Sequence, residues 1–452
     1  MDERIEHLSC DVIIVGCGVA GLYCALNLPR ELSIIMLAKT TLDECDSMLA
    51  QGGICVQHGT NDYMSFFEDT LRAGHFENRR ESVDLMIRAS RSVIDNLVSF
   101  GIDFAQNDDG TLRYTREGAH SRARICYHQD TTGAEITTKL LAAVKQLANV
   151  RILENTCMDD ILTELNVSVR SSQYTRQVSQ QKNARERCRG VAAHSGDGRT
   201  VSITANATVW ACGGIGGMYE RSTNFPCLTG DALRIAQAHG IALEHTDYVQ
   251  IHPTSLYTSK PGRAFLISES CRGEGAVLLD AQGKRFTDEL QPRDVVSAAI
   301  ERQMAVEGSN YVRLSFANVS KNEIMGHFKH IYEHCLTEGY DITQEPIPVV
   351  PAQHYFMGGV HVDRHSATTM PSLYAVGETS CNGVHGKNRL ASNSLLESLV
   401  FAQRAAWDIA RKESLPSPFP QTYSEHPVGA EAKAYKEFRM TKEAVCARTP
   451  SH

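Results

Sequence analysis

A glycine pattern near the start of the chain constrains the fold more than any other feature, because it directly follows an apolar run at residues 11–16. Such a run is typical of a buried strand, residues 20–28 are typical of a helix, and residues 33–38 again have the pattern of a buried strand. The order strand, turn, helix and strand predicts a βαβ unit, and therefore a parallel sheet with helices on its faces. Because glycines interrupt the apolar stretch of residues 12–28, we expect a strand and a helix there rather than a membrane span.

The spacing of these glycines is G-x-G-x-x-G, and each glycine has its own physical reason. The first permits a tight turn, the second lets a pyrophosphate approach the backbone, and the third lets the helix pack closely on the strand. The phosphate is expected at the N-terminus of the helix, where free N–H groups and the helix dipole attract negative charge. In its βαβ context the pattern predicts a dinucleotide site at Gly16, Cys17, Gly18, Val19, Ala20 and Gly21.

The second strand ends at Lys39, where an NAD-binding protein carries an acidic residue. A carboxylate about 20 residues after the glycine turn normally holds the adenosine ribose. The lysine therefore argues against simple use of NAD.

Length and composition narrow the class of protein. A chain of 452 residues suits two or three domains, and 42% apolar with 22% charged residues is ordinary for a soluble globular protein. The formal charge of -8 gives no basic footprint for nucleic acid. The acidic N-terminus lacks the features of a signal peptide, so we expect a cytoplasmic protein.

Fourteen cysteines are present, but none is spaced as C-x-x-C. Zinc ribbons and ferredoxin-type clusters therefore lack their ligand spacing. In a reducing compartment free thiols are expected rather than disulfides. The cysteine pattern predicts no metal site.

The sequence pattern and the residue composition change twice along the chain. Buried strands and Gly-rich turns occupy residues 1–240 and return at 352–410, whereas short strands and loops rich in His, Arg and Ser fill residues 241–351. This order predicts an α/β fold in which a Rossmann-like domain (1–240 and 352–410) is split by an inserted α+β capping domain (241–351).

Two polar segments lie outside this pattern. Residues 164–189 have no apolar periodicity and are expected to form an exposed excursion between strands. Residues 411–452 are rich in proline and then helical in pattern at about 429–446. We expect them to be the truncated start of a helical C-terminal region.

Six further motifs occur in a fixed order along the chain. They are AQGGI at 50–54, the turn at 211–214, HPT at 252–254, RGEG at 272–275, PRD at 292–294 and NRLASNSLLE at 388–397. Together they closely resemble the flavoprotein family of fumarate reductase, succinate dehydrogenase and L-aspartate oxidase, over about residues 8–410. The resemblance implies that the split Rossmann-like domain binds FAD.

In that family Lys39 is an ordinary FAD contact. Respiratory members attach FAD through a histidine shortly before the AQGG motif, and residues 45–49 contain none, so bound FAD is expected to be non-covalent. At one contact the family's oxidases commonly have serine, where this chain has Asp46. Besides the glycine pattern, the resemblance implies FAD contacts at Lys39, Asp46, Ser47, Ala50, Gln51, Gly52, Gly53, Asp231, Glu378, Ser394 and Leu395.

Two arginines, two histidines and a serine in and around the inserted part suit a molecule with two carboxylates. Arginine presents a fixed fork of donors that matches a carboxylate, and hydroxyl and imidazole groups add further donors. The resemblance implies the same dicarboxylate-binding residues, adds Glu269 and Ser392, and makes His252 and Arg293 catalytic, with Arg293 transferring the proton. The five residues are His252, Ser268, Arg293, His354 and Arg389.

Glu117 is the residue that points to one substrate within the family. Aspartate carries an ammonium group that fumarate and succinate lack, so its site needs one more carboxylate. Residues 115–121 (TREGAHS) resemble the oxidase branch, in which the glutamate faces the substrate amine, and residues 345–355 resemble the same branch. The resemblance implies oxidation of L-aspartate to iminoaspartate in de novo NAD biosynthesis. Oxygen or fumarate would accept the electrons, and quinolinate synthase would consume the imine.

Three alternatives remain at this point. A soluble fumarate reductase would not need Glu117, so its turnover would survive Glu117→Gln. A flavoprotein subunit of a membrane-bound complex would need an iron–sulfur partner, and the absent flavin-linking histidine argues against it. A defective chain would follow from the divergent tail, although no predicted site residue lies there.

Overall fold

A parallel five-stranded sheet forms the centre of the molecule in the computed structural model, which describes residues 5–59, 61–165, 186–419 and 421–423. All neighbouring strands in this sheet run parallel. In sheet order they are β17 (Leu373–Ala375), β10 (Ala207–Trp210), β2 (Val12–Val15), β3 (Ile34–Leu37) and β6 (Val150–Leu153). With helix α1 (Val19–Asn27) between β2 and β3, the predicted βαβ unit is confirmed.

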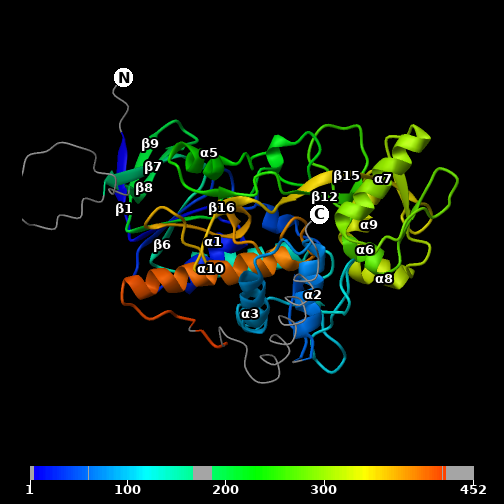
Figure 1. Cartoon of the computed structure of the whole chain (residues 1–452), viewed down its shortest axis with the longest axis horizontal. Helices are drawn as coiled ribbons and strands as arrows, with labels where there is room; N and C mark the ends of the chain where they lie inside the picture. Colours follow the sequence, from blue (N-terminus) through cyan, green and yellow to red (C-terminus); the bar gives the residue numbers. More distant parts are fainter. Residues whose placement is uncertain (1–4, 60, 166–185, 420, 424–452) are drawn as a thin grey trace, which may run out of the picture.

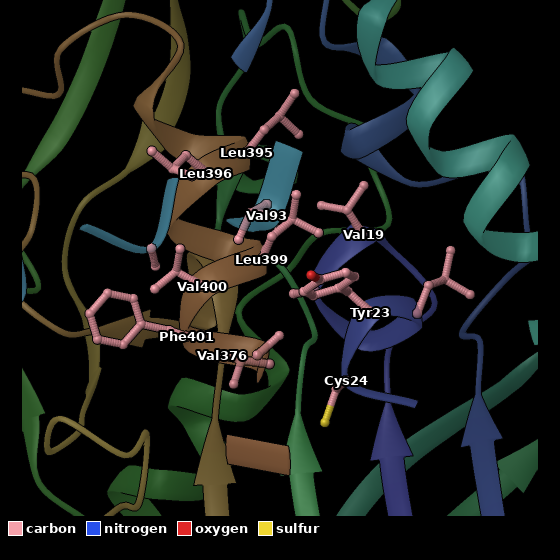
Figure 2. Close-up of a cluster of buried hydrophobic side chains, with 14 of the residues drawn as sticks. Val19, Tyr23, Cys24, Val93, Val376, Leu395, Leu396, Leu399, Val400 and Phe401 are labelled. Atoms are coloured by element: carbon pink, nitrogen blue, oxygen red, sulfur yellow. The ribbon is translucent and has the colours of Figure 1, made fainter. Parts of the chain in front are cut away.

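Alternate residues of this sheet face two different hydrophobic cores, as the two-residue period of a strand requires. Ile14 and Met36 belong to one core, which helices fill, whereas Ile13 and Ile35 belong to the other. The helices of the first core are α1, α2 (Tyr63–Ala73), α3 (Arg80–Ser99), α4 (Thr132–Lys145) and α10 (Asn393–Lys412). Figure 2 shows its centre, where Tyr23 of α1, Val93 of α3 and Leu399 of α10 meet beside the sheet.

The second core lies between the parallel sheet and a mixed sheet. The strands of that mixed sheet are β1 (Glu6–Ser9), β9 (Thr200–Thr204), β8 (Glu186–Ser195) and β7 (Thr156–Leu165), and helix α5 (Asp231–Ala238) packs beside them. Because β7 runs to Leu165 and β8 begins at Glu186, the predicted excursion at 164–189 is wrong at both ends. Its centre, 166–185, lies outside the described residues. The polar residues of these ends lie on both faces of the strands, Glu186 on one and Arg187 and Arg189 on the other, so they do not show the alternation that marks a strand.

A third hydrophobic core lies at one end of the molecule, opposite β1 and β7–β9 (Figure 1). All its buried members lie between Leu256 and Val349. Four helices, α6 (Glu269–Gly273), α7 (Arg293–Glu307), α8 (Lys321–His327) and α9 (Lys329–Thr337), pack there against an antiparallel sheet. The strands of that sheet are β12 (Val249–Leu256), β15 (Ile347–Phe356), β14 (Val312–Ser315) and β13 (Val277–Leu279).

The segment 241–351 differs from its prediction in its helices and in its C-terminal boundary. An α+β composition was predicted here, but individual helices were not located among the short strands and loops; α7–α9 escaped notice because their exposed faces are charged and only narrow apolar stripes reach the core. The predicted boundary at 351/352 falls inside β15, which continues from the third core towards the parallel sheet.

The remaining short elements connect these layers. They are β4 (Ile54–Cys55), β5 (Ile125–Cys126), β11 (Leu243–Glu244), β16 (Gly359–His361), β18 (Ser380–Cys381) and the 3-10 turns Asp46–Leu49, Gly216–Met218 and Gly377–Thr379. None of the described helices is long and apolar enough to cross a membrane. The helix predicted at about 429–446 lies outside the described residues.

Candidate functional site

One cavity of about 1700 Å³, including its open mouth, runs from the glycine turn to the arginines of the third core. All the predicted cofactor residues except Gly21 line it, as do all the predicted substrate and catalytic residues. The structure therefore brings together segments from residue 16 to residue 395 around a single space.

The glycine turn has the geometry that its residue types predict. Gly16 has φ +114°, and a Cβ there would lie 2.0 Å from the Ala211 carbonyl oxygen, so only glycine fits. A Cβ on Gly21 would lie 2.1 Å from the Gly16 carbonyl oxygen, which explains why Gly21 serves helix packing and not the cavity. Gly18 precedes α1 and gives it no side-chain cap; the Val19 N–H donates to Ser47 Oγ at 3.1 Å, and the start of the helix lines the cavity.

Lys39 and Asp231 form an ion pair on the wall of this cavity, with 2.7 Å between Lys39 Nζ and Asp231 Oδ2. Lys39 Nζ also donates to Thr229 Oγ1 at 2.7 Å and to the Cys227 carbonyl at 2.9 Å. These bonds join Lys39, just beyond the C-terminal end of β3, to a segment about 190 residues further along the chain.

Two buried carboxyl groups, Asp46 and Glu378, flank the middle of the cavity. Asp46 Oδ1 accepts from the Phe225 N–H at 2.9 Å, but its Oδ2 has no partner. Burial raises the pKa of Asp46 to about 7, and burial together with the charge of Asp46 raises that of Glu378 to about 8. Gln51 Oε1 is also buried without a partner. Free polar atoms on the wall of a cavity suit a polar cofactor such as a dinucleotide.

At the far end of the cavity, Arg293 and Arg389 converge on Gln250. Arg293 NH1 donates to Gln250 Oε1 at 2.9 Å, and Arg389 Nε donates to the same oxygen at 3.3 Å. Arg389 also donates to Ser394 Oγ and lies over the Tyr355 ring, 4.4 Å from its centroid. Burial and the charge of Arg293 lower the pKa of Arg389 to about 10, which leaves Arg389 charged at neutral pH.

Gln250 was not predicted from the sequence. It lies two residues before His252 on the same strand, and residues two apart on a strand share a face. The two-residue spacing from His252 is the sequence signal that could have identified Gln250 as a site residue.

Two buried glutamates face the same end of the cavity. Glu269 Oε2 accepts from Arg293 Nε at 2.6 Å and lies 3.4 Å from Arg272 NH2. Burial alone would raise the pKa of Glu269, but these two arginines outweigh it and lower the pKa. For Glu117 burial dominates, followed by repulsion from Glu269, and its pKa is raised.

Glu117 is held by two serine hydroxyls. Ser270 Oγ donates to Oε1 at 2.7 Å and Ser392 Oγ to Oε2 at 2.5 Å. Ser392 has φ +59°, a left-handed conformation that aims its side chain at the glutamate from the start of α10. Ser268 caps α6 by accepting from the Ser270 N–H at 3.2 Å, so the serines form one chain of contacts.

Both predicted histidines are neutral and face the arginines. Burial, and then Arg293, hold the pKa of His252 and of His354 well below its ordinary value. Their rings meet edge to face at 5.0 Å between centroids. His354 Nδ1 lies 2.7 Å from Thr223 Oγ1, whereas His252 Nε2 is buried in the cavity wall without a partner.

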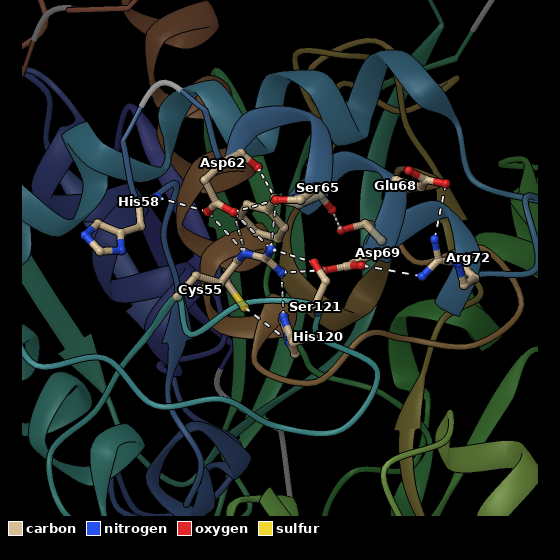
Figure 3. Close-up of polar contacts among 12 residues, drawn as sticks. Cys55, His58, Asp62, Ser65, Glu68, Asp69, Arg72, His120 and Ser121 are labelled. Carbon is tan, nitrogen blue, oxygen red and sulfur yellow. Dashed lines mark hydrogen bonds and ion pairs between the residues drawn. The ribbon is translucent and has the colours of Figure 1, made fainter. Parts of the chain in front are cut away.

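The segment that carries Glu117 is fixed by a buried polar cluster. Figure 3 shows Asp62, Asp69 and His120 directed at one centre. All three contact the guanidinium of Arg124, whose side chain is fully buried. Arg124 NH2 lies 3.0 Å from Asp62 Oδ1, Arg124 NH1 lies 2.7 Å from Asp69 Oδ2, and Arg124 NH1 donates to His120 Nδ1 at 3.0 Å. His120 Nε2 then donates to the Ala391 carbonyl at 3.0 Å, which links residues 115–121 to the start of α10. Sequence reasoning missed this cluster.

Five cysteine thiols line the cavity: Cys17, Cys45, Cys157, Cys212 and Cys227. Burial is the main cause that raises the pKa of every one, to about 12 for Cys17 and about 11 for Cys45. All cysteines of the described residues are free thiols, as predicted.

Comparison with known proteins agrees with this geometry. Residues 11–395 match the family described as FAD binding domain. The L-aspartate oxidase of Clostridium perfringens is 47% identical over 400 residues, covering 88% of this chain and 86% of that protein. The enzyme of the same name from Pseudomonas aeruginosa is 38% identical over 434 residues, covering 91% and 78%. The chain belongs to the L-aspartate oxidase family of FAD-binding proteins.

Solved structures agree with membership of this family. A quinol fumarate reductase variant from E. coli superposes with a TM-score of 0.80 at 27% identity, covering 97% of this chain and 74% of that one. The Sdh1 structure from Mycobacterium smegmatis gives a TM-score of 0.73 at 28% identity, covering 96% and 73%. The family and the FAD cofactor predicted from the sequence are thus confirmed.

Proposed function

We propose that this protein oxidises L-aspartate to iminoaspartate with non-covalently bound FAD. The observation that carries the proposal is the placing of one carboxylate, Glu117, in the same cavity wall as Arg293 and Arg389. Two cationic forks suit two carboxylates, and one anionic group suits an ammonium. L-Aspartate has this combination of charges, whereas fumarate and succinate lack the cation.

The two substrate carboxylates are assigned to the arginine end. Arg389 binds one through its guanidinium, and Arg293 binds the other together with the neutral histidines. If His252 Nδ1 accepts from the Thr254 N–H, 3.2 Å away, its single ring hydrogen lies on Nε2, the atom without a partner. That N–H is then free to donate to a carboxylate oxygen of the substrate.

The substrate ammonium is assigned to Glu117. Burial and then Glu269 raise the pKa of Glu117, and the positive charge of an ammonium at hydrogen-bond distance would favour the carboxylate. Ser270 and Ser392 fix both oxygens, so the carboxylate is oriented before substrate binds.

Oxidation removes a hydride from Cα and a proton from the amine nitrogen. FAD, when bound, supplies the hydride acceptor. Arg293 is assigned the proton transfer: it passes its Nε proton to the Glu269 carboxylate, 2.6 Å away, and takes up the proton that the amine releases. Burial of both residues excludes water from this pair.

The FAD contacts are assigned to the glycine turn, Lys39 with Asp231, residues 46–53, Glu378 and the start of α10. The N-terminus of α1, together with Ser47, whose Oγ accepts from the Val19 N–H, would hold the pyrophosphate. The residues around the third core, 241–351, would act as a cap over the substrate, with residues 1–240 and 352–410 as the FAD-binding domain. Oxygen or fumarate is proposed as the electron acceptor and quinolinate synthase as the enzyme that consumes iminoaspartate.

Anaerobic reduction of the flavin tests the proposal. L-Aspartate added without oxygen to the FAD-loaded protein should bleach the visible flavin absorbance, and fumarate should restore it. Bleaching by succinate but not by aspartate would instead support a fumarate reductase. If a chemical reductant bleaches the flavin and neither aspartate nor fumarate has any effect on it, the proposal is wrong.

A further inference from the structure

A histidine outside the cavity is buried without any hydrogen bond. His327 ends α8 and is only 3% exposed, yet neither ring nitrogen has a partner. The ring lies against Tyr127 and Phe328, with 4.3 Å between centroids in both pairs, so its plane is fixed. A buried polar atom without a partner costs free energy, which a ligand at that atom would recover.

Two carboxylates lie beside this ring. His327 Nδ1 is 3.7 Å from Glu323 Oε1 and 3.9 Å from Glu274 Oε1, too far for hydrogen bonds. Glu323 and His327 lie one helical turn apart on the same face of α8, and Glu274 follows α6. The three ligand atoms all lie within 4.8 Å of one another. Ligand atoms around a tetrahedral zinc are separated by roughly 3.4 Å, so small side-chain shifts bring them to that distance.

The state of these groups suits a metal ion. Burial, and then the charge of Arg113, lower the pKa of His327 to about 4, so the imidazole is neutral, as a metal ligand must be. Glu274 Oε1 accepts from Thr115 Oγ1 at 2.8 Å, the kind of supporting hydrogen bond that orients a carboxylate ligand.

We infer that Glu274, Glu323 and His327 bind a divalent transition-metal ion, and that Zn²⁺ fits this set best. One imidazole and two carboxylates are the nitrogen and oxygen donors that zinc accepts, whereas Mg²⁺ prefers oxygen alone. Three protein ligands leave a fourth position for water. Arg113 opposes cation binding, with NH2 3.8 Å from Glu323 Oε1, but its side chain is 52% exposed and free to turn into solvent.

The position of this set links the cap to the segment that carries Glu117. Thr115 lies two residues before Glu117, and a Cβ on Gly273 would lie 2.2 Å from the Arg116 carbonyl, so the two backbones touch. Asp130, from the same part of the chain, accepts from the N–H groups of His330 and Ile331 at the start of α9. A metal ion here would fasten α6 and α8 together beside residues 113–130.

Zinc content measures this directly. The FAD-loaded protein is treated with a chelator, desalted, titrated with Zn²⁺ by calorimetry and analysed for bound metal. We expect one zinc per chain that Glu323→Gln and His327→Asn both abolish, and no uptake of Mg²⁺. Thr115→Val should weaken binding by about tenfold. Arg113→Gln should tighten it, because a competing cation is removed.

Glu333→Gln is the matched control, since Glu333 is an exposed acid on the neighbouring helix α9. FAD content and thermal midpoint without metal establish that each variant is folded, and Glu323, 28% exposed, tolerates the change even if His327→Asn does not. The inference is overturned if the unsubstituted protein retains no zinc. It is equally overturned if Glu323→Gln retains as much as Glu333→Gln, which would place the metal on other groups such as the cysteines.

Discussion

Arg293 and Arg389 are joined through a single atom, because both donate hydrogen bonds to Oε1 of Gln250, at 2.9 and 3.3 Å. Arg293 begins α7, Arg389 precedes α10, and Gln250 lies on β12 between them in the sequence. The two guanidinium groups repel each other, and the shared acceptor offsets part of that repulsion. It therefore holds the two forks side by side, as the proposed binding of two carboxylates needs.

Gln250→Met should raise the KM for aspartate. The substitution keeps the volume but removes the oxygen that both arginines share, and a hydrogen bond to a charged group contributes about 1.5–3 kcal/mol, or about tenfold to a hundredfold in KM. Steady-state kinetics check this, with the exposed Gln344→Met as control. An unchanged KM would mean that the arginines hold their positions without the amide.

Glu117→Gln should lower kcat/KM for aspartate by at least about tenfold while leaving fumarate reduction by the chemically reduced enzyme unchanged. The amide cannot balance an ammonium charge, whereas fumarate has no such group. Equal losses with both substrates would show that Glu117 supports the site rather than recognising the amine.

Gly18→Ala and Gly21→Ala should affect different properties, FAD affinity in the first and stability in the second. A Cβ on Gly21 would meet the Gly16 carbonyl oxygen at 2.1 Å, so this variant should lose about 1–3 kcal/mol of stability. A Cβ on Gly18 would lie 3.0 Å from Ser47 Oγ, a flexible side chain, and both residues line the cavity, so this variant should lose FAD affinity while its FAD-free thermal midpoint stays the same. Fluorescence titration with FAD and thermal unfolding separate the two, and identical behaviour would contradict the assignment.

Glu378 should make the FAD-free protein less stable as the pH rises. Its pKa in the folded state is about 8, above the ordinary value of 4.5, so the folded state favours the neutral acid. That contribution is fully present below pH 4.5 and is lost as the pH rises through 8. The thermal midpoint should therefore fall between pH 5 and 8, and Glu378→Gln should reduce the fall. Parallel curves for the two proteins would contradict the raised pKa.

The parallel sheet could be predicted from the sequence because buried strands and a glycine turn leave local signals. Val12–Val15, Val19–Asn27 and Ile34–Leu37 lie within about two residues of the expected ranges. Helices α7–α9 left weaker signals, since only a narrow stripe of each faces the third core. The polar ends of β7 and β8 left no sequence signal, because their polar residues lie on both faces of the strands.

For the candidate site, predictability depended on whether a residue belongs to a motif. Glu117, Arg293 and Arg389 lie within recognisable motifs, and the structure brings them to one cavity. Gln250 and Arg124 do not, since an isolated glutamine or arginine has no local pattern that reports its partners. Their importance follows only from contacts with residues more than 40 positions away.

The low reactivity of the five thiols on the cavity wall bears on the resistance of the protein to oxidation. With oxygen as the proposed electron acceptor, hydrogen peroxide would form in the cavity that Cys17 and Cys45 line. Peroxide attacks the thiolate rather than the thiol, and burial keeps the pKa of these groups above its ordinary value. At neutral pH they are therefore poor targets for sulfenic acid formation. The burial that packs the flavin pocket therefore also protects these thiols from hydrogen peroxide formed in the pocket.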